Sequence, residues 1–209
     1  MPNRRKWAMI PGFVAIAAAA AVLSAYSGAS SSQGFAPEQP IAFPHPVHVK
    51  TLGMNCLYCH YAANKSPDPG MPAVGTCAGC HNIAAVRPQR PAIDGRPART
   101  SAEIQKVIDY TTRKEPIPWV RIHKLPEYVR FPHVRHVNAG VSCQTCHGDV
   151  QNMERVSQYA SLNMGWCVNS HVNGYKPADG IRLAGGTPTA QDIAAEPKRA
   201  RYDCAICHY

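Results

Sequence analysis

The sequence is poor in aromatic and charged residues. Aromatic side chains make up 8% of the 209 residues and charged side chains 17%, and few sustained apolar periodicities follow the first thirty residues. A large aromatic-rich core is therefore excluded. Proline is abundant instead, with 19 residues, so most of the chain is expected to form loops and short helices. Something other than a side-chain core must hold such a chain together.

Eight of the nine cysteines form four Cys-x-x-Cys pairs, and a histidine follows each pair directly. Two thiols three positions apart reach the two vinyl groups on one edge of a porphyrin, and the next histidine supplies an axial nitrogen to the iron. Zinc sites do not require a histidine after every pair, and disulfides have no use for one. The pattern therefore indicates c-type haem attachment. The four motifs are Cys56/Cys59/His60, Cys77/Cys80/His81, Cys143/Cys146/His147 and Cys204/Cys207/His208.

A fifth, imperfect copy of the motif contains Cys167 and His171, with Ser170 in the place of the second cysteine. Serine forms no thioether, so a haem at this site would be held by Cys167 alone. The alternative is a decayed site without haem. The retained Cys and His, together with the histidine count, favour a fifth haem c with a single covalent link.

Five of the ten histidines lie outside these motifs, and four of them form an internal repeat. Each copy reads Phe-Pro-His-x-x-His and stands shortly before a haem motif, so its two imidazoles can serve two neighbouring irons. Ten histidines would give five irons two axial ligands each, which predicts mostly bis-His haems. The repeat comprises Phe43, His45 and His48 in the first copy, and Phe131, His133 and His136 in the second.

His123, the remaining free histidine, belongs to no such pattern. We expect it to be the tenth axial ligand; the alternatives are a solvated side chain near a propionate or a supporting role beside the iron. If His123 is not a ligand, one haem is His/Met-ligated or five-coordinate. Met71 and Met164 are then the candidate ligands, although methionine beside a haem more often packs against it.

The chain carries a formal charge of +9. Five haems would bring about ten propionate charges, offset by about one positive charge per ferric iron, so the oxidised protein would carry about +4. The basic surplus is best explained by propionate partners and a membrane-proximal cluster. No nucleic-acid-binding motif is present, and we expect no nucleic-acid partner.

The amino-terminal region predicts a membrane anchor. Arg4, Arg5 and Lys6 precede an uncharged run from Trp7 to Tyr26. About twenty helical residues span about 30 Å, the thickness of a hydrocarbon core. The flanking charges place the amino terminus in the cytoplasm and the haem region on the periplasmic side of a bacterial cytoplasmic membrane. A cleaved secretory signal, with its cleavage site within 27–29, is the alternative.

The motifs divide the chain into an anchor (1–30), a linker (31–40), a first unit with two haems (41–90), a connector (91–130) and a second unit with three haems (131–209). In the connector, Thr100 and Glu103 predict a capping box that opens one amphipathic helix ending before Pro116. The expected fold is mostly irregular with short α-helices, and stacked haems form its core.

The paired Phe-x-His-x-x-His elements and haem motifs resemble class III multihaem cytochromes c. Four further segments are similar to the membrane-anchored pentahaem subunit of alternative complex III, with Ser170 as a departure from the family pattern. The resemblance implies a bacterial quinol-oxidising assembly, respiratory or photosynthetic, with an iron–sulfur protein, quinone-binding membrane subunits and a monohaem cytochrome c as partners. The segments are 117–121, 125–131, 136–143 and 162–167.

Three functions follow from these features. The first is a non-catalytic electron-transfer subunit, because irons with two histidine ligands have no site for a substrate. The second is a multihaem reductase, which needs one open iron position and would show a high-spin haem. The third is an anchored quinol dehydrogenase subunit, which would oxidise quinol by itself. We expect the first.

Overall fold

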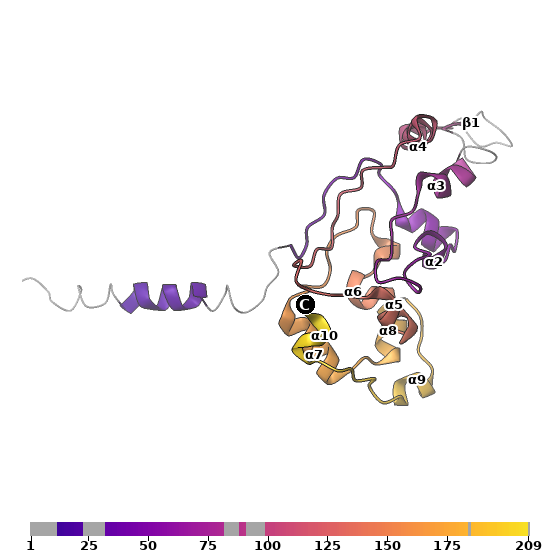
Figure 1. The fold of residues 1–209 in the computed structure, drawn as a ribbon. Helices are drawn as coiled ribbons and strands as arrows, with labels where there is room; N and C mark the ends of the chain where they lie inside the picture. The colour runs from indigo at the N-terminus through magenta and orange to yellow at the C-terminus, as the bar shows by residue number, and fades with distance from the viewer. Residues whose placement is uncertain (1–11, 23–31, 82–87, 91–98, 184, 209) are drawn as a thin grey trace, which may run out of the picture.

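The computed structural model describes residues 12–22, 32–81, 88–90, 99–183 and 185–208. Their secondary structure is almost entirely short helices joined by extended segments (Figure 1). The helices are the π-helical turn η1 (Pro46–Thr51), α2 (Cys56–Cys59), α3 (Val74–His81), α4 (Ala102–Arg113), α5 (His133–Asn138), α6 (Cys143–His147), the 3₁₀ turn η2 (Val150–Asn152), α7 (Met164–Asn173), α8 (Pro177–Leu183), α9 (Ala190–Ala194) and α10 (Cys204–Cys207). Two strands, β1 (Gln89–Arg90) and β2 (Arg99–Thr100), pair antiparallel, with Gln89 opposite Thr100.

The predicted anchor lies partly outside the described residues, which include only 12–22 of the run from Trp7 to Tyr26. Residues 12–22 are helical and exposed. Within the described ranges, no helix combines the length and the apolar character needed to cross a membrane.

Side chains form only a small core. Ile41, Val107 and Ile117 are buried against one another, and Trp119 and Cys77 pack against this cluster. Among the described residues, the other buried hydrophobic side chains are alanines, at 63, 78, 160 and 178. This cluster joins α4 to the amino-terminal part of the fold, and the rest of the described chain has little side-chain core of its own.

Two extended segments, around Gln39 and around Val120, run side by side between the two ends of the molecule (Figure 1). The Gln39 side-chain amide donates to the Val120 carbonyl at 3.0 Å and accepts from the Val120 backbone N–H at 2.9 Å. These two bonds satisfy backbone groups that have no partner strand. They fix the connector alongside the segment that leads into the first haem unit.

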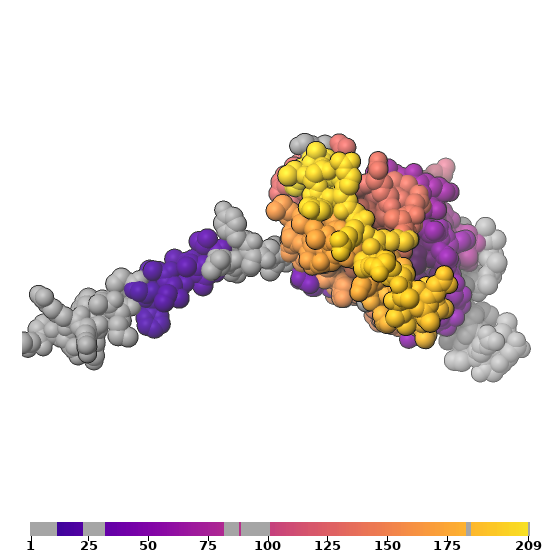
Figure 2. Space-filling model, turned by 90° about the horizontal axis from the view of Figure 1, so that it is seen from below, coloured from indigo at the N-terminus to yellow at the C-terminus, as the bar shows by residue number. Residues whose placement is uncertain are grey.

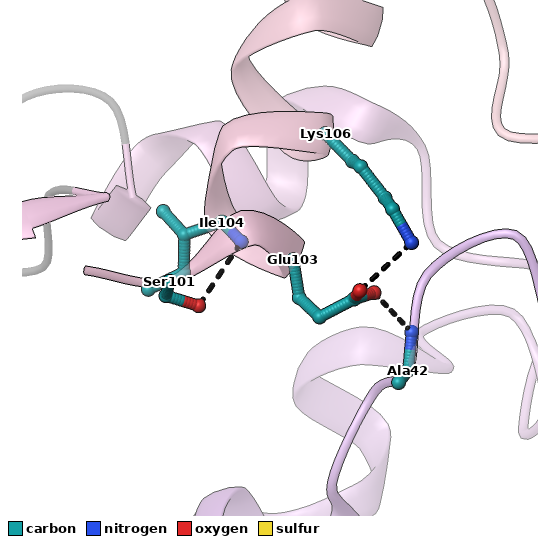
Figure 3. Close-up of polar contacts among 5 residues, drawn as sticks. All are labelled: Ala42, Ser101, Glu103, Ile104 and Lys106. Atoms are coloured by element: carbon teal, nitrogen blue, oxygen red, sulfur yellow. Dashed lines mark hydrogen bonds and ion pairs between the residues drawn. The ribbon is translucent and has the colours of Figure 1, made fainter.

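The start of α4 corrects one prediction. The N-cap is Ser101, whose hydroxyl accepts from the Ile104 N–H at 3.4 Å, so the capping box predicted at Thr100 is wrong (Figure 3). Glu103 instead accepts from the Ala42 N–H and from the Lys106 ammonium group, both at 2.7 Å. These bonds lower the pKa of Glu103. The Glu103 carboxylate thus joins α4 to the segment around Ala42, which is distant in sequence. Local capping rules do not predict such a contact.

Candidate haem-binding sites

Each haem motif lies on a short helix. Helices α2 and α10 begin and end at the two cysteines of their motifs, and α6 begins at Cys143 and ends at His147. In α3 and α7 the motif occupies the carboxy-terminal part. Residues three apart lie on one face of a helix, so each pair of thiols, or the single thiol Cys167, is presented to one side. All nine cysteines are free of disulfide bonds.

Three of the nine motif cysteines are exposed, although thiols beside a haem core are expected to be partly covered. They are Cys80, Cys143 and Cys204, and the other six are half-buried. Cys80 is exposed because α3 turns Ala78 into the fold, and two residues along a helix advance by about 200°, to the opposite face. Its sulfur still faces the first motif: the pKa of Cys59 is raised first by burial and then by repulsion from Cys80. The polypeptide alone therefore leaves the predicted attachment thiol of Cys80 open to solvent.

The starts of two motif helices are fixed by asparagine side chains. Asn55 accepts from the Leu57 N–H at 2.8 Å, and Asn163 accepts from the Trp166 N–H at 2.7 Å. Capping of this kind defines where so short a helix begins. It therefore sets the positions of the cysteines that follow.

The two Phe-x-His-x-x-His elements have the same geometry. Phe43 stacks on His48 with ring centres 4.2 Å apart and meets His45 edge-on at 4.8 Å. In the second copy, Phe131 stacks on His136 at 4.3 Å and meets His133 edge-on at 4.9 Å. Each phenylalanine thus contacts two imidazoles, one nearly perpendicular to its own ring and one stacked on it.

Four of the candidate ligands donate Nδ1–H to a backbone carbonyl. His48 donates to Pro44 and His136 to Pro132, both at 3.0 Å. The other two bonds join distant segments: His133 donates to Pro67 at 3.1 Å, and His171 donates to Arg201. A carbonyl can only accept, so the proton is on Nδ1 and Nε2 is left with a free lone pair, the form that binds a metal.

Three pairs of imidazoles have the spacing of two ligands on one iron. The ring centres are 6.1 Å apart for His48 and His81, 6.1 Å for His136 and His171, and 6.4 Å for His133 and His147. Two imidazoles on opposite sides of one metal, each bonded at about 2.0–2.1 Å, have ring centres roughly 6 Å apart. In each pair, one member comes from a haem motif and the other from a Phe-His element.

His45 lies near enough to His60 to be affected by its charge. The pKa of His45 is lowered to about 4, first by burial and then by repulsion from a charge on His60. Its Nδ1 is buried without a hydrogen-bond partner in the described structure. These surroundings keep His45 neutral, as axial ligation requires.

His123 and His208 are not brought together. The His123 ring lies 4.3 Å from that of His147, edge-on, which is too close for two ligands on opposite sides of one iron. The ring that contacts His208 is Tyr128, with centres 5.7 Å apart. An antiparallel bridge between Val129 and His208 positions the tyrosine. Sequence reasoning missed Tyr128, because no local pattern marks a residue placed by a long-range backbone pairing.

The two methionine candidates lie at the surface. Met71 and Met164 are 59% and 70% exposed. In the described ranges, no group of three or more His, Cys, Asp or Glu side chains is arranged to hold a bare metal ion.

Several motif thiols lie beside thiols of another motif. Cys143 donates its thiol proton to Cys56, which lowers the pKa of Cys56 to about 6 and raises that of Cys143. Burial, with a smaller contribution from nearby Cys167, raises the pKa of Cys146 to about 11. The sulfur atoms of neighbouring motifs are thus close together along the fold.

A comparison with curated proteins gives one informative match. The chain is similar to a multihaem cytochrome c. The relative is the multiheme cytochrome c subunit of menaquinone reductase from Nitratidesulfovibrio vulgaris, 26% identical over 157 residues that cover 65% of this chain and 69% of the relative. No protein-family model matches the sequence. The match agrees with the motifs and the paired imidazoles, and it does not single out alternative complex III.

Proposed function

We propose that the protein is a non-catalytic electron-transfer subunit that carries five c-type haems. The observation that carries this proposal is the repeated pairing of imidazoles at 6.1–6.4 Å, each pair joining a haem motif to a Phe-His element. Bound haem supplies one-electron redox chemistry. The chain attaches the haems, fills both axial positions of most irons and holds the imidazoles in fixed orientations.

The small side-chain core supports the same proposal. The described residues bury one compact cluster around Val107, which is little for a chain of 209 residues. Five porphyrins would supply the apolar area that the side chains lack. We propose that stacked haems form most of the core.

We further propose that the subunit belongs to a membrane quinol-oxidising complex similar to alternative complex III. Its partners would be an iron–sulfur protein, quinone-binding membrane subunits and a monohaem cytochrome c. The relative named above is a subunit of a menaquinone reductase, which supports a link to membrane quinone chemistry. The segment from Trp7 to Tyr26 would anchor the subunit in the bacterial cytoplasmic membrane, with the haems on the outer side.

The first test is the haem content and spin state of the full-length subunit purified in detergent. The intact mass of the denatured chain counts covalent haems and shows whether the first 26 residues are retained. We expect five haems and electron paramagnetic resonance signals dominated by low-spin ferric iron. A chain without haem would overturn the proposal.

The second test asks whether quinol supplies the electrons. In membranes containing the whole complex, adding menaquinol should reduce these haems, whereas the isolated subunit should not respond. Reduction of the isolated subunit would instead indicate a quinol site of its own. Haems that stay oxidised in the complex would refute the quinol-oxidising assignment.

A multihaem reductase is the second candidate, because the ring beside His208 is Tyr128 and not an imidazole. A haem attached there with no second histidine would have an exchangeable sixth position. Carbon monoxide added to the reduced protein distinguishes the two functions. Binding to about one haem in five, together with nitrite turnover, would favour the reductase, and the electron-transfer proposal predicts no turnover.

A further inference from the structure

We propose that the haems stand in one unbranched row, in the order second, first, third, fourth and fifth motif along the chain. This inference rests on the proposed function, because it takes haem attachment at each motif as given. It goes further by naming which haems are neighbours and which two are the ends of the row. The order differs from the order of the motifs in the sequence.

The first Phe-His element joins the second and first motifs. His48 lies opposite His81 of the second motif, with ring centres 6.1 Å apart. The Met54 N–H, two residues before the first motif, donates to the His48 carbonyl at 3.0 Å, so the same turn also adjoins the first motif. His45, three residues earlier on this turn, would serve the iron of the first motif. Phe43 contacts both His45 and His48. Two irons whose ligands share one turn of backbone must be adjacent.

The loop that follows the first motif is bonded to the second Phe-His element. The backbone N–H groups of His133 and Val134 donate to the carbonyls of Pro67 and Ser66, at 3.0 and 3.2 Å. The His133 ring donates to the same Pro67 carbonyl at 3.1 Å.

The sulfur atoms bring the same two motifs together. Cys56 of the first motif and Cys143 of the third are joined by a hydrogen bond between their side chains. The side chains that would attach these two haems are therefore close together. The first and third haems are neighbours, and the contact between the two halves of the chain lies between them.

The second Phe-His element joins the third and fourth motifs. His133 lies opposite His147, and His136, one turn later, lies opposite His171. In both halves of the chain, the earlier histidine of the Phe-His element serves the haem motif that is nearer in sequence, and the later histidine serves the motif farther away. Along the row, the first half therefore runs from the farther motif to the nearer one, and the second half runs from the nearer motif to the farther one.

The fifth motif adjoins the fourth. The Ala200 N–H donates to the His171 carbonyl at 3.1 Å, and the His171 ring donates to the Arg201 carbonyl. Residues 200–201 lead directly into Cys204. Figure 1 shows the resulting sequence of helices, from α3 through α2 and α6 to α7 and α10, and Figure 2 shows the carboxy-terminal segment (yellow) packed on the orange segment that contains α7.

The two ends of the row are therefore the haems on Cys77/Cys80 and on Cys204/Cys207. Each end haem has one haem neighbour, and each inner haem has two. An electron that crosses the whole subunit must enter at one end and leave at the other. The redox partners should accordingly dock beside α3 and beside α10, the helices that carry the two end motifs.

The test is nuclear Overhauser contact between haem substituents in the fully reduced, full-length protein in detergent. Carbon monoxide is added so that any iron with an open position is also diamagnetic. Each haem is assigned through contacts to the Cβ protons of its own labelled cysteines. We expect interhaem contacts between the second and first motifs, the first and third, the third and fourth, and the fourth and fifth.

A contact between the second and third motifs, or between the first and fourth, would overturn the proposed order. The variant C204A/C207A removes one end haem and should keep the other three contacts; loss of a contact among the remaining four haems would show that the fifth is not an end. If this variant does not fold, the interhaem contacts measured in the wild-type protein still decide the order of the haems. Absence of haem would refute the proposed function itself, whereas five haems in another order would refute the row alone.

Discussion

Replacing His136 by alanine tests the assignment of axial ligands most directly. His136 stacks on Phe131 at 4.3 Å, donates to the Pro132 carbonyl at 3.0 Å and lies 6.1 Å from His171. An aromatic pair is worth about 0.5–1.5 kcal/mol and a hydrogen bond about 0.5–1.5 kcal/mol. The protein contacts alone therefore account for about 1–3 kcal/mol of stability. Loss of the ligand would add to this cost.

The spectroscopic effect of His136→Ala should be confined to one haem. The iron at Cys167 would keep His171 and lose its other ligand, so about one fifth of the ferric signal should change from low-spin to high-spin. A haem held by the single thioether of Cys167 would still be covalently attached, so it should stay with the protein on extraction with acidified acetone. Electron paramagnetic resonance of the purified variant measures the spin state, and haem extraction checks the attachment.

Phe131→Leu is the matched control. It removes the stacking partner and leaves both His136 and the Pro132 carbonyl in place. Urea unfolding should show a loss of about 0.5–1.5 kcal/mol, with the spin states of the haems the same as in the wild type. An unchanged low-spin spectrum in His136→Ala would refute the reasoning, because it would mean that His136 is not a ligand.

Three further predictions concern the backbone, the fifth attachment site and pH. Gly148 has φ +72° and ψ −163°, a conformation that essentially only glycine adopts, and a Cβ there would lie 2.7 Å from Tyr159 Cγ. Gly148→Ala should therefore cost more than the roughly 1–3 kcal/mol of the backbone strain alone, and equal urea midpoints for variant and wild type would contradict this. Ser170→Cys restores the second thiol of the fifth motif, one turn before the end of α7. The pyridine haemochrome spectrum should then shift toward that of five doubly linked haems. An unchanged spectrum would mean that no haem occupies the site at Cys167. Hydrogen bonds from Lys106 and from the Ala42 N–H hold the pKa of Glu103 below its ordinary 4.5, so the folded state binds fewer protons than the unfolded state and stability should fall as pH decreases below about 4.5. Urea unfolding at several pH values measures this, and rising stability as pH decreases below about 4.5 would contradict it.

Local sequence patterns predicted the parts of the site that depend on local structure. A cysteine pair with an adjacent histidine defines its own geometry within one helical turn, as at α2 and α10. The geometry within each Phe-His element is equally local, since the contacts among its own three rings lie within six residues. These features need no knowledge of the rest of the fold.

The pairing of ligands could not be predicted in the same way. His133 is oriented by Pro67, a residue 66 positions earlier whose carbonyl carries no side-chain signal. Tyr128 contacts His208 because a backbone bridge joins Val129 to His208, about eighty residues later in the sequence. No local sequence pattern predicts this contact. The contact of Glu103 with Ala42 is of the same kind. Such contacts are set by the tertiary path of the chain, which composition and spacing do not determine.

The carbonyls that accept from His48, His133 and His136 all belong to prolines. A proline ring fixes φ, so each of these carbonyl groups sits on a stiffened stretch of backbone and has little freedom to turn. An imidazole held by such an acceptor and by a stacked phenylalanine changes its position little when the charge on a bound iron changes. If the protein carries haems as proposed, the reorganisation energy for each electron transfer would be low, because the polar groups around each iron would already be in place. The proline-rich loops would then favour fast electron exchange.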